Sequence, residues 1–305
     1  MAVTPPPTLS GEFVSAFPEF IPTSTIDLVS DCDPDGTSSI SWSVSGDAFG
    51  PYAGTFVETG TATVGPQAGP LYVNGIPLGQ IVSLEAFFSI DSPTGQVMGS
   101  LRMVASTANR MGGCHDLVDF VLPDGQTLVS GEFRRLFMQW GTYEALIVAD
   151  GAAYLDSGEA DVLLERFDGT GMQEVDAVQG SFRSLQSGVI PAPPGRATGG
   201  GRVDDVTFGF NALRDKSGPK GRCVVVDATV DVHVSCLDVS VIGVVGNRAV
   251  ITGRATYNGI PVTYRMTVVD VAESGADADT WSISLSNGYS AGGTLTEGNV
   301  QVSAK

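Results

Sequence analysis

The sequence predicts an all-β protein built from two β-sandwich-like domains, and three observations lead to this prediction. Glycine accounts for 39 of the 305 residues, nearly double its usual share, while apolar residues make up 42% of the chain. Short apolar or alternating runs recur between Gly, Pro and Asp residues, which is typical of strands joined by tight turns. A stretch rich in proline and glycine also divides the chain, and the charge balance differs on its two sides.

The dividing stretch covers residues 186–201, where a proline-containing piece is followed by three glycines. We interpret it as a linker between an acidic β-domain over residues 1–185 and a C-terminal β-sandwich domain over residues 202–305. Residues up to Gln186 include 23 acidic and 6 basic side chains, whereas those from Ser187 onward include 11 and 10. Such asymmetry favours two separate folding units.

The first domain contains several predicted strands. The clearest ones alternate, or run apolar, between turn residues: Ser39–Val44, Thr55–Val64, Ile81–Ile90 and Gln96–Val104. The segment Phe133–Trp140 resembles a short helix in length, but its apolar residues alternate and glycines flank it, so we predict a strand there too.

The same domain has the signs of an internal duplication. Residues 56–64 match residues 154–162 in residue type at most positions, and residues 97–102 match 178–183 in the same order. Two such units would pack face to face as a pseudo-symmetric sandwich or barrel. Chance similarity within a sequence rich in Gly, Thr and Val is the alternative interpretation.

The C-terminal domain shows an alternating run and a hairpin signal. Val230, Val232 and Val234 alternate with polar residues, which predicts a strand with one buried face. Asn258-Gly259 separates two apolar runs, Ala249–Tyr257 and Ile260–Val271, and this dipeptide favours a tight hairpin because both turn positions need positive φ.

Four cysteines fall two to each predicted domain, and their spacing does not match a CxxC metal or redox site. The domain division favours the pairs Cys32–Cys114 and Cys223–Cys236. Disulfides persist outside the cytosol, so this pairing predicts an extracellular or cell-surface protein. Two pairs of buried free thiols are the alternative.

Two acidic segments are candidate Ca²⁺ sites. The first contains Asp31, Asp33 and Asp35 at the alternate spacing of a calcium loop, although Trp42 stands where a bidentate Glu is expected and a plain turn competes with it. In the second, four carboxylates crowd one loop and would repel one another unless solvated or bridged by a cation. They are Asp270, Glu273, Asp277 and Asp279.

The net charge of −18 argues against several partners. Nucleic acids and anionic membrane surfaces both require clustered basic residues. The one basic cluster, Arg214, Lys216, Lys220 and Arg222, is interpreted as a solvated loop or as a docking site for an acidic surface. No apolar run is long enough to span a bilayer.

Catalytic motifs are weak. His115 lies beside Cys114 and Asp116, but no nucleophile motif accompanies it, and His233 falls on the polar side of its predicted strand. We therefore expect a non-enzymatic protein.

The C-terminal third resembles a known module. Its segments Gly218-Pro219-Lys220-Gly221-Arg222-Cys223, Asn247-Arg248-Ala249 and Gly292-Gly293-Thr294-Leu295 occur in one order with the Asn258-Gly259 hairpin. Together they look like the post-COAP-1 domain of secreted bacterial proteins, and the preceding region resembles the choice-of-anchor P proteins more loosely. The resemblance implies an extracellular or surface-attached protein and carries no assigned chemistry.

Three functions compete on these grounds. The leading hypothesis is a secreted or cell-surface structural or adhesive binding protein. The second is a carbohydrate-binding or carbohydrate-active protein that recognises a surface glycan through exposed Trp42, Trp140 and Trp281, although tryptophans on strands are more often core residues. The third is a self-associating subunit of a filament or virion surface, because edge strands can recruit another chain.

Overall fold

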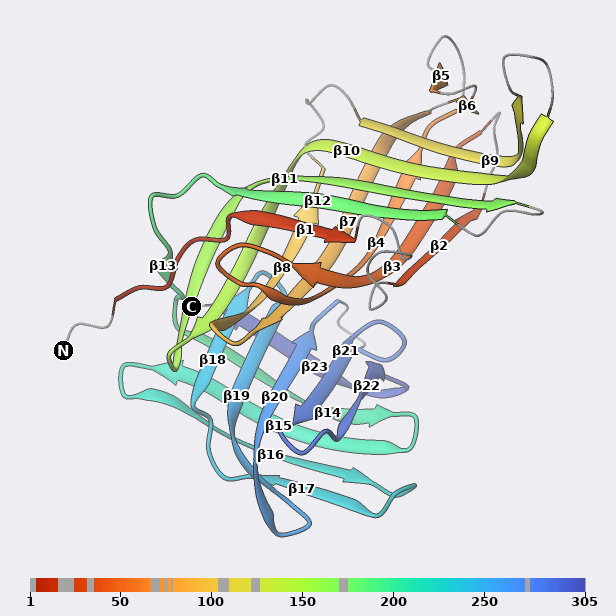
Figure 1. Ribbon diagram of the computed structural model, residues 1–305. Coiled ribbons are helices and arrows are strands. Elements are labelled where there is room, and N and C mark those ends of the chain that lie inside the picture. The colour runs from red at the N-terminus through yellow and green to blue at the C-terminus, as the bar shows by residue number, and fades with distance from the viewer. Residues whose placement is uncertain are drawn as a thin grey trace. The chain divides into compact units, whose positions relative to one another are not determined.

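The computed structural model describes residues 4–15, 25–31, 36–66, 72–73, 76–77, 79–103, 110–121, 127–169, 175–271 and 275–304. The regular secondary structure of these residues is β-strand throughout, so the all-β prediction is confirmed. The strands form two large curled antiparallel sheets and one short hairpin (Figure 1). Contacts group the chain into unit 1, residues 1–147 with 156–189, and unit 2, residues 148–155 with 190–305.

The first sheet is an eleven-stranded sheet in which pairing runs in a ring. The N-terminal strand β1 pairs with both β12 and β3, and β10 pairs with both β8 and β11. The sheet contains β1 (Gly11–Ser15), β2 (Thr25–Asp31), β3 (Ser38–Ala48), β4 (Gly54–Val64), β7 (Gly79–Ser92), β8 (Gly95–Arg102), β9 (Arg110–Val121), β10 (Thr127–Ala149), β11 (Ala152–Gly169), β12 (Val175–Ser184) and β13 (Ile190–Pro191). The separate hairpin is β5 (Tyr72–Val73) with β6 (Ile76–Pro77).

Strand β3 shows why these residues form a sheet with one buried face. Ile40, Trp42 and Val44 are buried, whereas Ser39 before them and Ser43 between the last two are exposed. This period of two matches the side-chain alternation of a strand. The indole of Trp42 lies against Gly60 of β4, where a Cβ atom would fall only 2.6 Å from Trp42 Cε2, so a glycine is required at that position.

The two copies of the predicted duplication are strands in each case, but they pair differently. The segments of the first copy lie in β4 and β8, which are separated by β7, while those of the second lie in β11 and β12, which are direct neighbours. Both copies belong to one sheet. The two copies therefore do not form separate sheets: β7 enters the first copy, and the second copy completes the same sheet, whose pairing runs in a ring.

A buried polar network fixes the N-terminal segment to unit 1. Asp156 is 2% exposed, and its Oδ2 accepts a hydrogen bond from the Leu9 backbone N–H at 2.6 Å and lies 3.1 Å from the Tyr143 hydroxyl. Its Oδ1 accepts from the Ser157 N–H at 3.0 Å and the Ser184 hydroxyl at 2.7 Å. Burial and the nearby Asp156 carboxylate raise the pKa of Tyr143. Together these four contacts offset the free-energy cost of burying the Asp156 carboxylate away from water.

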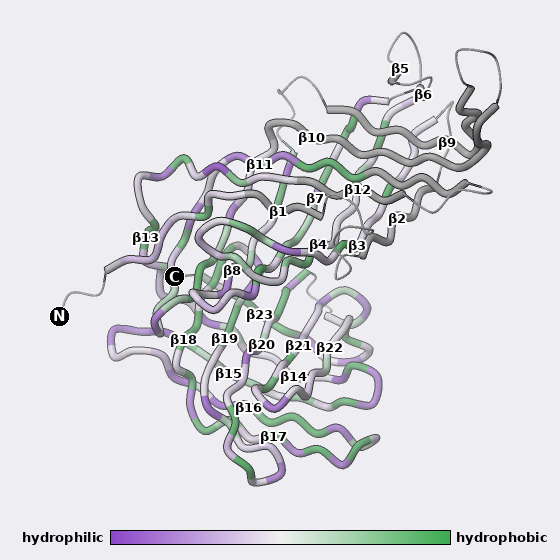
Figure 2. The backbone as a smooth tube through the Cα atoms, viewed as in Figure 1, coloured by the Kyte–Doolittle hydropathy of each residue, from purple (hydrophilic) through white to green (hydrophobic). Residues whose placement is uncertain are grey.

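The second sheet, in unit 2, has ten antiparallel strands that curl around an apolar core. At its centre the rings of Phe208 and Trp281 stack with centroids 4.2 Å apart. Figure 2 shows hydrophobic and hydrophilic residues alternating along these strands. The strands are β14 (Gly195–Val203), β15 (Val206–Asp215), β16 (Gly218–Asp227), β17 (Val232–Cys236), β18 (Val241–Val245), β19 (Arg248–Tyr257), β20 (Ile260–Val269), β21 (Thr280–Leu285), β22 (Ser290–Thr294) and β23 (Glu297–Ala304).

The last part of the predicted linker lies in a strand. Residues 195–201 form the larger part of β14, which pairs with β15 on one side and β23 on the other. The glycine run serves close packing: a Cβ atom at Gly199 would lie 2.6 Å from Val300 Cγ1. Sequence alone could not separate this role of glycine from flexibility, since both favour the same residue.

The predicted strand around Val232 and Val234 is confirmed with one change. Both side chains are buried in β17, but Val230 lies in the preceding turn and is 60% exposed. Asp231 adopts a positive φ of 53°, which ends the turn just before the strand begins.

The predicted disulfide Cys223–Cys236 is present and joins β16 to β17 with its Cα atoms 4.9 Å apart. The two residues adjoin the paired positions Val224 and Ser235, so they face each other across neighbouring strands. Cys32 and the side chain of Cys114 lie outside the described residues, and their pairing stays a prediction.

The Asn258-Gly259 hairpin is confirmed, with φ of 48° and 83° at its two turn residues. We predict that Gly259→Ala lowers the free energy of unfolding by about 1 kcal/mol, because alanine is strained at positive φ. A Cβ atom at Gly259 would meet nothing within 4 Å, so the loss comes from the backbone alone. Gly209→Ala is the matched control, since Gly209 has equal space in a strand and no positive φ. Equal losses for both variants in urea unfolding would contradict this prediction.

Candidate functional site

The acidic loop after β20 closes the free edge of strand β23. Among the described residues, β23 ends the sheet and has β14 as its one strand neighbour, so the N–H groups of its other edge have no strand partner there. Asp279 Oδ2 accepts a hydrogen bond from the Val300 N–H at 3.0 Å, and Asp270 Oδ2 accepts one from the Val302 N–H at 2.9 Å. Two carboxylates therefore take the place of a neighbouring strand at this edge and protect it from pairing.

The loop itself is held by further bonds to the same residues. Asp279 is fully buried, and its Oδ1 accepts from the Val271 N–H at 2.7 Å. Its backbone carbonyl accepts from the Leu295 N–H at 2.9 Å. Gly275, at φ 70°, lies against Asn299 so closely that a Cβ atom would fall 2.5 Å from Asn299 Cα. Side chain and backbone together fix the loop over β23.

Of the four residues predicted to bind calcium in this loop, two already accept hydrogen bonds from backbone N–H groups. Asp270 and Asp279 accept backbone hydrogen bonds, Asp277 is exposed, and Glu273 lies outside the described residues. Among the residues that the structure describes, no group of three or more His, Cys, Asp or Glu side chains is placed to hold a metal ion. The first candidate site also falls outside: Asp33 and Asp35 are not described, nor is the side chain of Asp31. Calcium binding stays a prediction at both places.

A polar pocket of about 290 Å³ lies beside the closed edge, on β14 and β23. Its volume is close to the lower end of small-ligand sites, which are usually about 300–1,000 Å³. One guanidinium, one carboxylate, two amides and two hydroxyls line it together with a single apolar residue. These residues are Arg196, Thr198, Asp270, Asn299, Gln301, Val302 and Ser303.

The pairing register explains why these side chains meet. Arg196 is opposite Ser303, and Thr198 is opposite Gln301. Successive residues of a strand point to opposite faces, so Arg196 and Thr198 share one face of β14, and Gln301 and Ser303 share the same face of β23. The core lies on the other face, where Ala197 and Val300 are fully buried.

Most polar groups of the pocket have no protein partner. In the described part of the chain, the side chains of Arg196, Thr198, Gln301 and Ser303 make no hydrogen bond or ion pair. The Asn299 Oδ1 atom is buried and has no hydrogen-bond partner among the same described residues. The Asn299 Oδ1 atom lies against Gly275 of the covering loop, so the side chains open to a ligand are those of Arg196, Thr198, Gln301 and Ser303.

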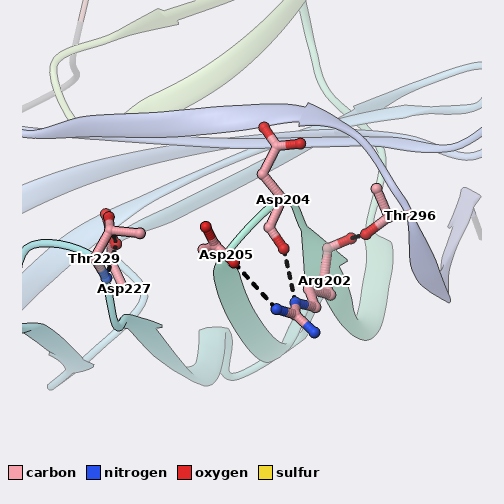
Figure 3. A network of polar contacts seen from close by, with 6 residues as sticks. All are labelled: Arg202, Asp204, Asp205, Asp227, Thr229 and Thr296. Carbon is pink, nitrogen blue, oxygen red and sulfur yellow. Dashed lines mark hydrogen bonds and ion pairs between the residues drawn. The ribbon is translucent and has the colours of Figure 1, made fainter.

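Arg202, which lies on β14 with Arg196, differs from it because the Arg202 side chain has partners. Its Nε donates to the Asp204 carbonyl at 2.7 Å, and its Nη2 lies 3.2 Å from Asp205 Oδ1 (Figure 3). Its own carbonyl accepts from the Thr296 N–H and hydroxyl. Arg202 is therefore engaged by its own turn, whereas the guanidinium of Arg196 is available to a ligand.

Other residues singled out in the sequence do not form a site. Trp42 and Trp281 are 4% and 1% exposed, so these two are core residues and the expected exposed tryptophans were wrong for them. The side chains of Trp140, His115 and Asp116 lie outside the described residues. His233 is exposed as predicted, and its backbone N–H donates to Asn258 Oδ1 at 2.7 Å.

No protein-family model matches the chain, and neither a curated protein nor a solved structure is significantly similar to it. The resemblance to the post-COAP-1 and choice-of-anchor P regions therefore stays a prediction. No helix in the described residues is long and apolar enough to cross a membrane.

Apart from Asp270, sequence reasoning missed the residues of the pocket, because they come from β14 and β23, which lie far apart in the chain. Arg196 and Thr198 lay in the expected linker, and no motif marked Asn299, Gln301 or Ser303. One signal was present in the alternation of polar residues along 297–303, which indicates a strand with a polar outer face.

Proposed function

We propose that this protein is a non-enzymatic, extracellular binding protein that attaches to a surface glycan through the pocket of unit 2. The observation that carries the proposal is the set of unengaged polar side chains on β14 and β23. Sugars present many hydroxyl groups, and their recognition needs amide, hydroxyl and charged groups that converge on one place. The disulfide Cys223–Cys236 supports an oxidising compartment, where such a protein would act.

The position of the pocket on the sheet suits a protein that attaches to a glycan. The pocket lies on two paired strands of a large sheet, and the edge beside it is closed by Asp270 and Asp279. A site built on strands is held more rigidly than one on loops, so less ordering entropy is lost when a ligand binds. An adhesive protein gains from such a preorganised site.

The experiment measures binding of the labelled chain to a panel of neutral and acidic glycans. We expect at least one glycan to bind, and the double variant Thr198→Val with Gln301→Leu to bind it at least about tenfold more weakly, since each lost hydrogen bond leaves a ligand group unpaired. Thr207→Val is the control, because Thr207 is exposed on β15 and does not line the pocket. A panel without binding, or a pocket variant that binds as well as the control, would refute the proposal.

A further inference from the structure

The outer face of unit 2 continues from the pocket across β15 to β16. Thr198 pairs with Asn211, which pairs with Arg222, so these residues form one row over three strands. The next row contains Arg196, Leu213 and Lys220 in the same order. Each of the three cations is exposed, and all lie on the face opposite the core. The pocket is therefore one end of a longer surface.

Two of these cations are unengaged. Lys220 forms an ion pair with Asp215 at 3.3 Å. The guanidinium groups of Arg196 and Arg222 make no ion pair or hydrogen bond within the described residues. Two strand spacings and a two-residue offset place their Cα atoms about 12 Å apart. They form a pair of positive charges on one flat face.

The side chains of Thr198, Asn211 and Leu213 lie between the two arginines, and a row with glycines on two strands follows beyond Thr198 and Asn211. Gly200 of β14 pairs with Gly209 of β15 in the row beside Thr198 and Asn211. A Cβ atom at Gly209 would meet nothing within 4 Å, so the space above this strand is open. An extended ligand that reaches both arginines therefore crosses the exposed side chains of Asn211 and Leu213 on β15, and the glycine row leaves open space beside it.

The balance of acidic and basic residues in unit 2 also allows an anion to bind at this surface. The acidic excess of the protein is concentrated before residue 187, and residues 187–305 carry 11 acidic and 10 basic side chains. Within the pocket, the Asp270 Oδ2 is engaged by the Val302 N–H, which leaves Oδ1 to accept a sugar hydroxyl. Guanidinium groups bind carboxylates through paired, charge-assisted hydrogen bonds.

From these observations we infer that the glycan bound by unit 2 is an acidic polysaccharide, with one carboxylate-bearing sugar in the pocket at Arg196 and a neighbouring one at Arg222. This inference rests on the proposed glycan-binding function and specifies its ligand class. Neutral sugars would use the amides and hydroxyls of the pocket but would leave both guanidinium groups unpaired.

The test is calorimetric titration with an oligogalacturonate and with its methyl ester, which differs only in the masked carboxylates. We expect the acid to bind about tenfold or more tightly than the ester at low ionic strength, the range for loss of a charged hydrogen bond. Arg196→Ala and Arg222→Ala should each remove most of this preference. Lys216→Ala is the charge-matched control, since Lys216 is exposed in the β15–β16 turn and outside both rows.

Equal binding of acid and ester, or an equal loss in the Lys216→Ala variant, would overturn the inference. If neutral glycans then bind and depend on Thr198 and Gln301, the proposed function stands without it. If neither probe nor any glycan of the panel binds, both proposals fail. Because all three substituted side chains are exposed, thermal unfolding should show native folds for every variant.

Discussion

Replacing Asp156 with asparagine is expected to lower the free energy of unfolding of unit 1 by about 3 kcal/mol, the range for disruption of a buried charged hydrogen-bond network. Each carboxylate oxygen of Asp156 has two donors within 3.1 Å. The amide of asparagine would place an NH₂ group against two of those donors. The bonds to Leu9 and Tyr143, or those to Ser157 and Ser184, would then be lost.

Urea unfolding of unit 1 measures this loss, and hydrogen exchange of the peptide containing Leu9 reports on the N-terminal segment. We expect faster exchange at Leu9, because its N–H donates to Asp156 Oδ2. Glu159→Gln is the control on the same strand, since its partly exposed ion pair with Arg183 contributes less than about 1 kcal/mol. A variant with wild-type stability and unchanged exchange at Leu9 would show that the network is dispensable.

The second large effect concerns Glu58, a carboxyl group on the buried face of β4. It is 1% exposed, and its Oε1 accepts a hydrogen bond from Trp42 Nε1 at 2.9 Å. Its Oε2 has no hydrogen-bond partner in the described part of the protein. Burial raises the pKa of Glu58 from 4.5 to about 7, and the bond from Trp42 opposes this only in part. Glu58 is therefore protonated in the folded protein under mildly acidic conditions.

This raised pKa makes the stability of unit 1 depend on pH. Between pH 4.5 and 7 the folded state keeps the Glu58 proton while the unfolded state releases it, so stability falls as the pH rises through this window. The full contribution is present below pH 4.5 and is lost above about pH 7, a change of about 3 kcal/mol. Glu58→Gln removes the titration and keeps the size of the side chain.

The measurement is the free energy of unfolding of the wild type and of Glu58→Gln from pH 4.5 to 8. The difference between them isolates Glu58, because all other carboxylates are shared. We expect the wild type to lose about 3 kcal/mol relative to the variant across this range. A constant difference at every pH would mean that Glu58 does not change its ionisation on folding.

Local patterns predicted much of the fold. The alternation in Ser38–Ala48, the Asn258-Gly259 turn and the cysteine pair at 223 and 236 each depend on neighbours in sequence, so each could be predicted without the structure. The ring of pairings in unit 1 could not, because nothing local indicates that β1 lies between β12 and β3.

Predicting the candidate site would also have required contacts between residues far apart in the sequence. The acidic loop was recognised as a candidate cation site, but the hydrogen bonds of Asp270 and Asp279 to β23 could not be predicted, because the strand edge that they cover is invisible in sequence. The glycines of β14 were interpreted as flexible for a similar reason: their role is set by Val300, about a hundred positions away in the chain, against which Gly199 packs. The burial of the Glu58 carboxyl group was equally hard to predict, since in the sequence Glu58 looks like any polar residue of an alternating strand.

The pairing of an early strand with the last strand in each unit has a consequence for synthesis. In unit 1, β1 pairs with β12, and in unit 2, β14 pairs with β23. A ribosome releases β1 long before β12 exists, so neither unit can close until nearly all of it has been made. Contacts so distant in sequence form slowly and leave strand edges open meanwhile. The nascent chain therefore carries its greatest risk of aggregation while it is incomplete, and folding assistance matters most at that stage.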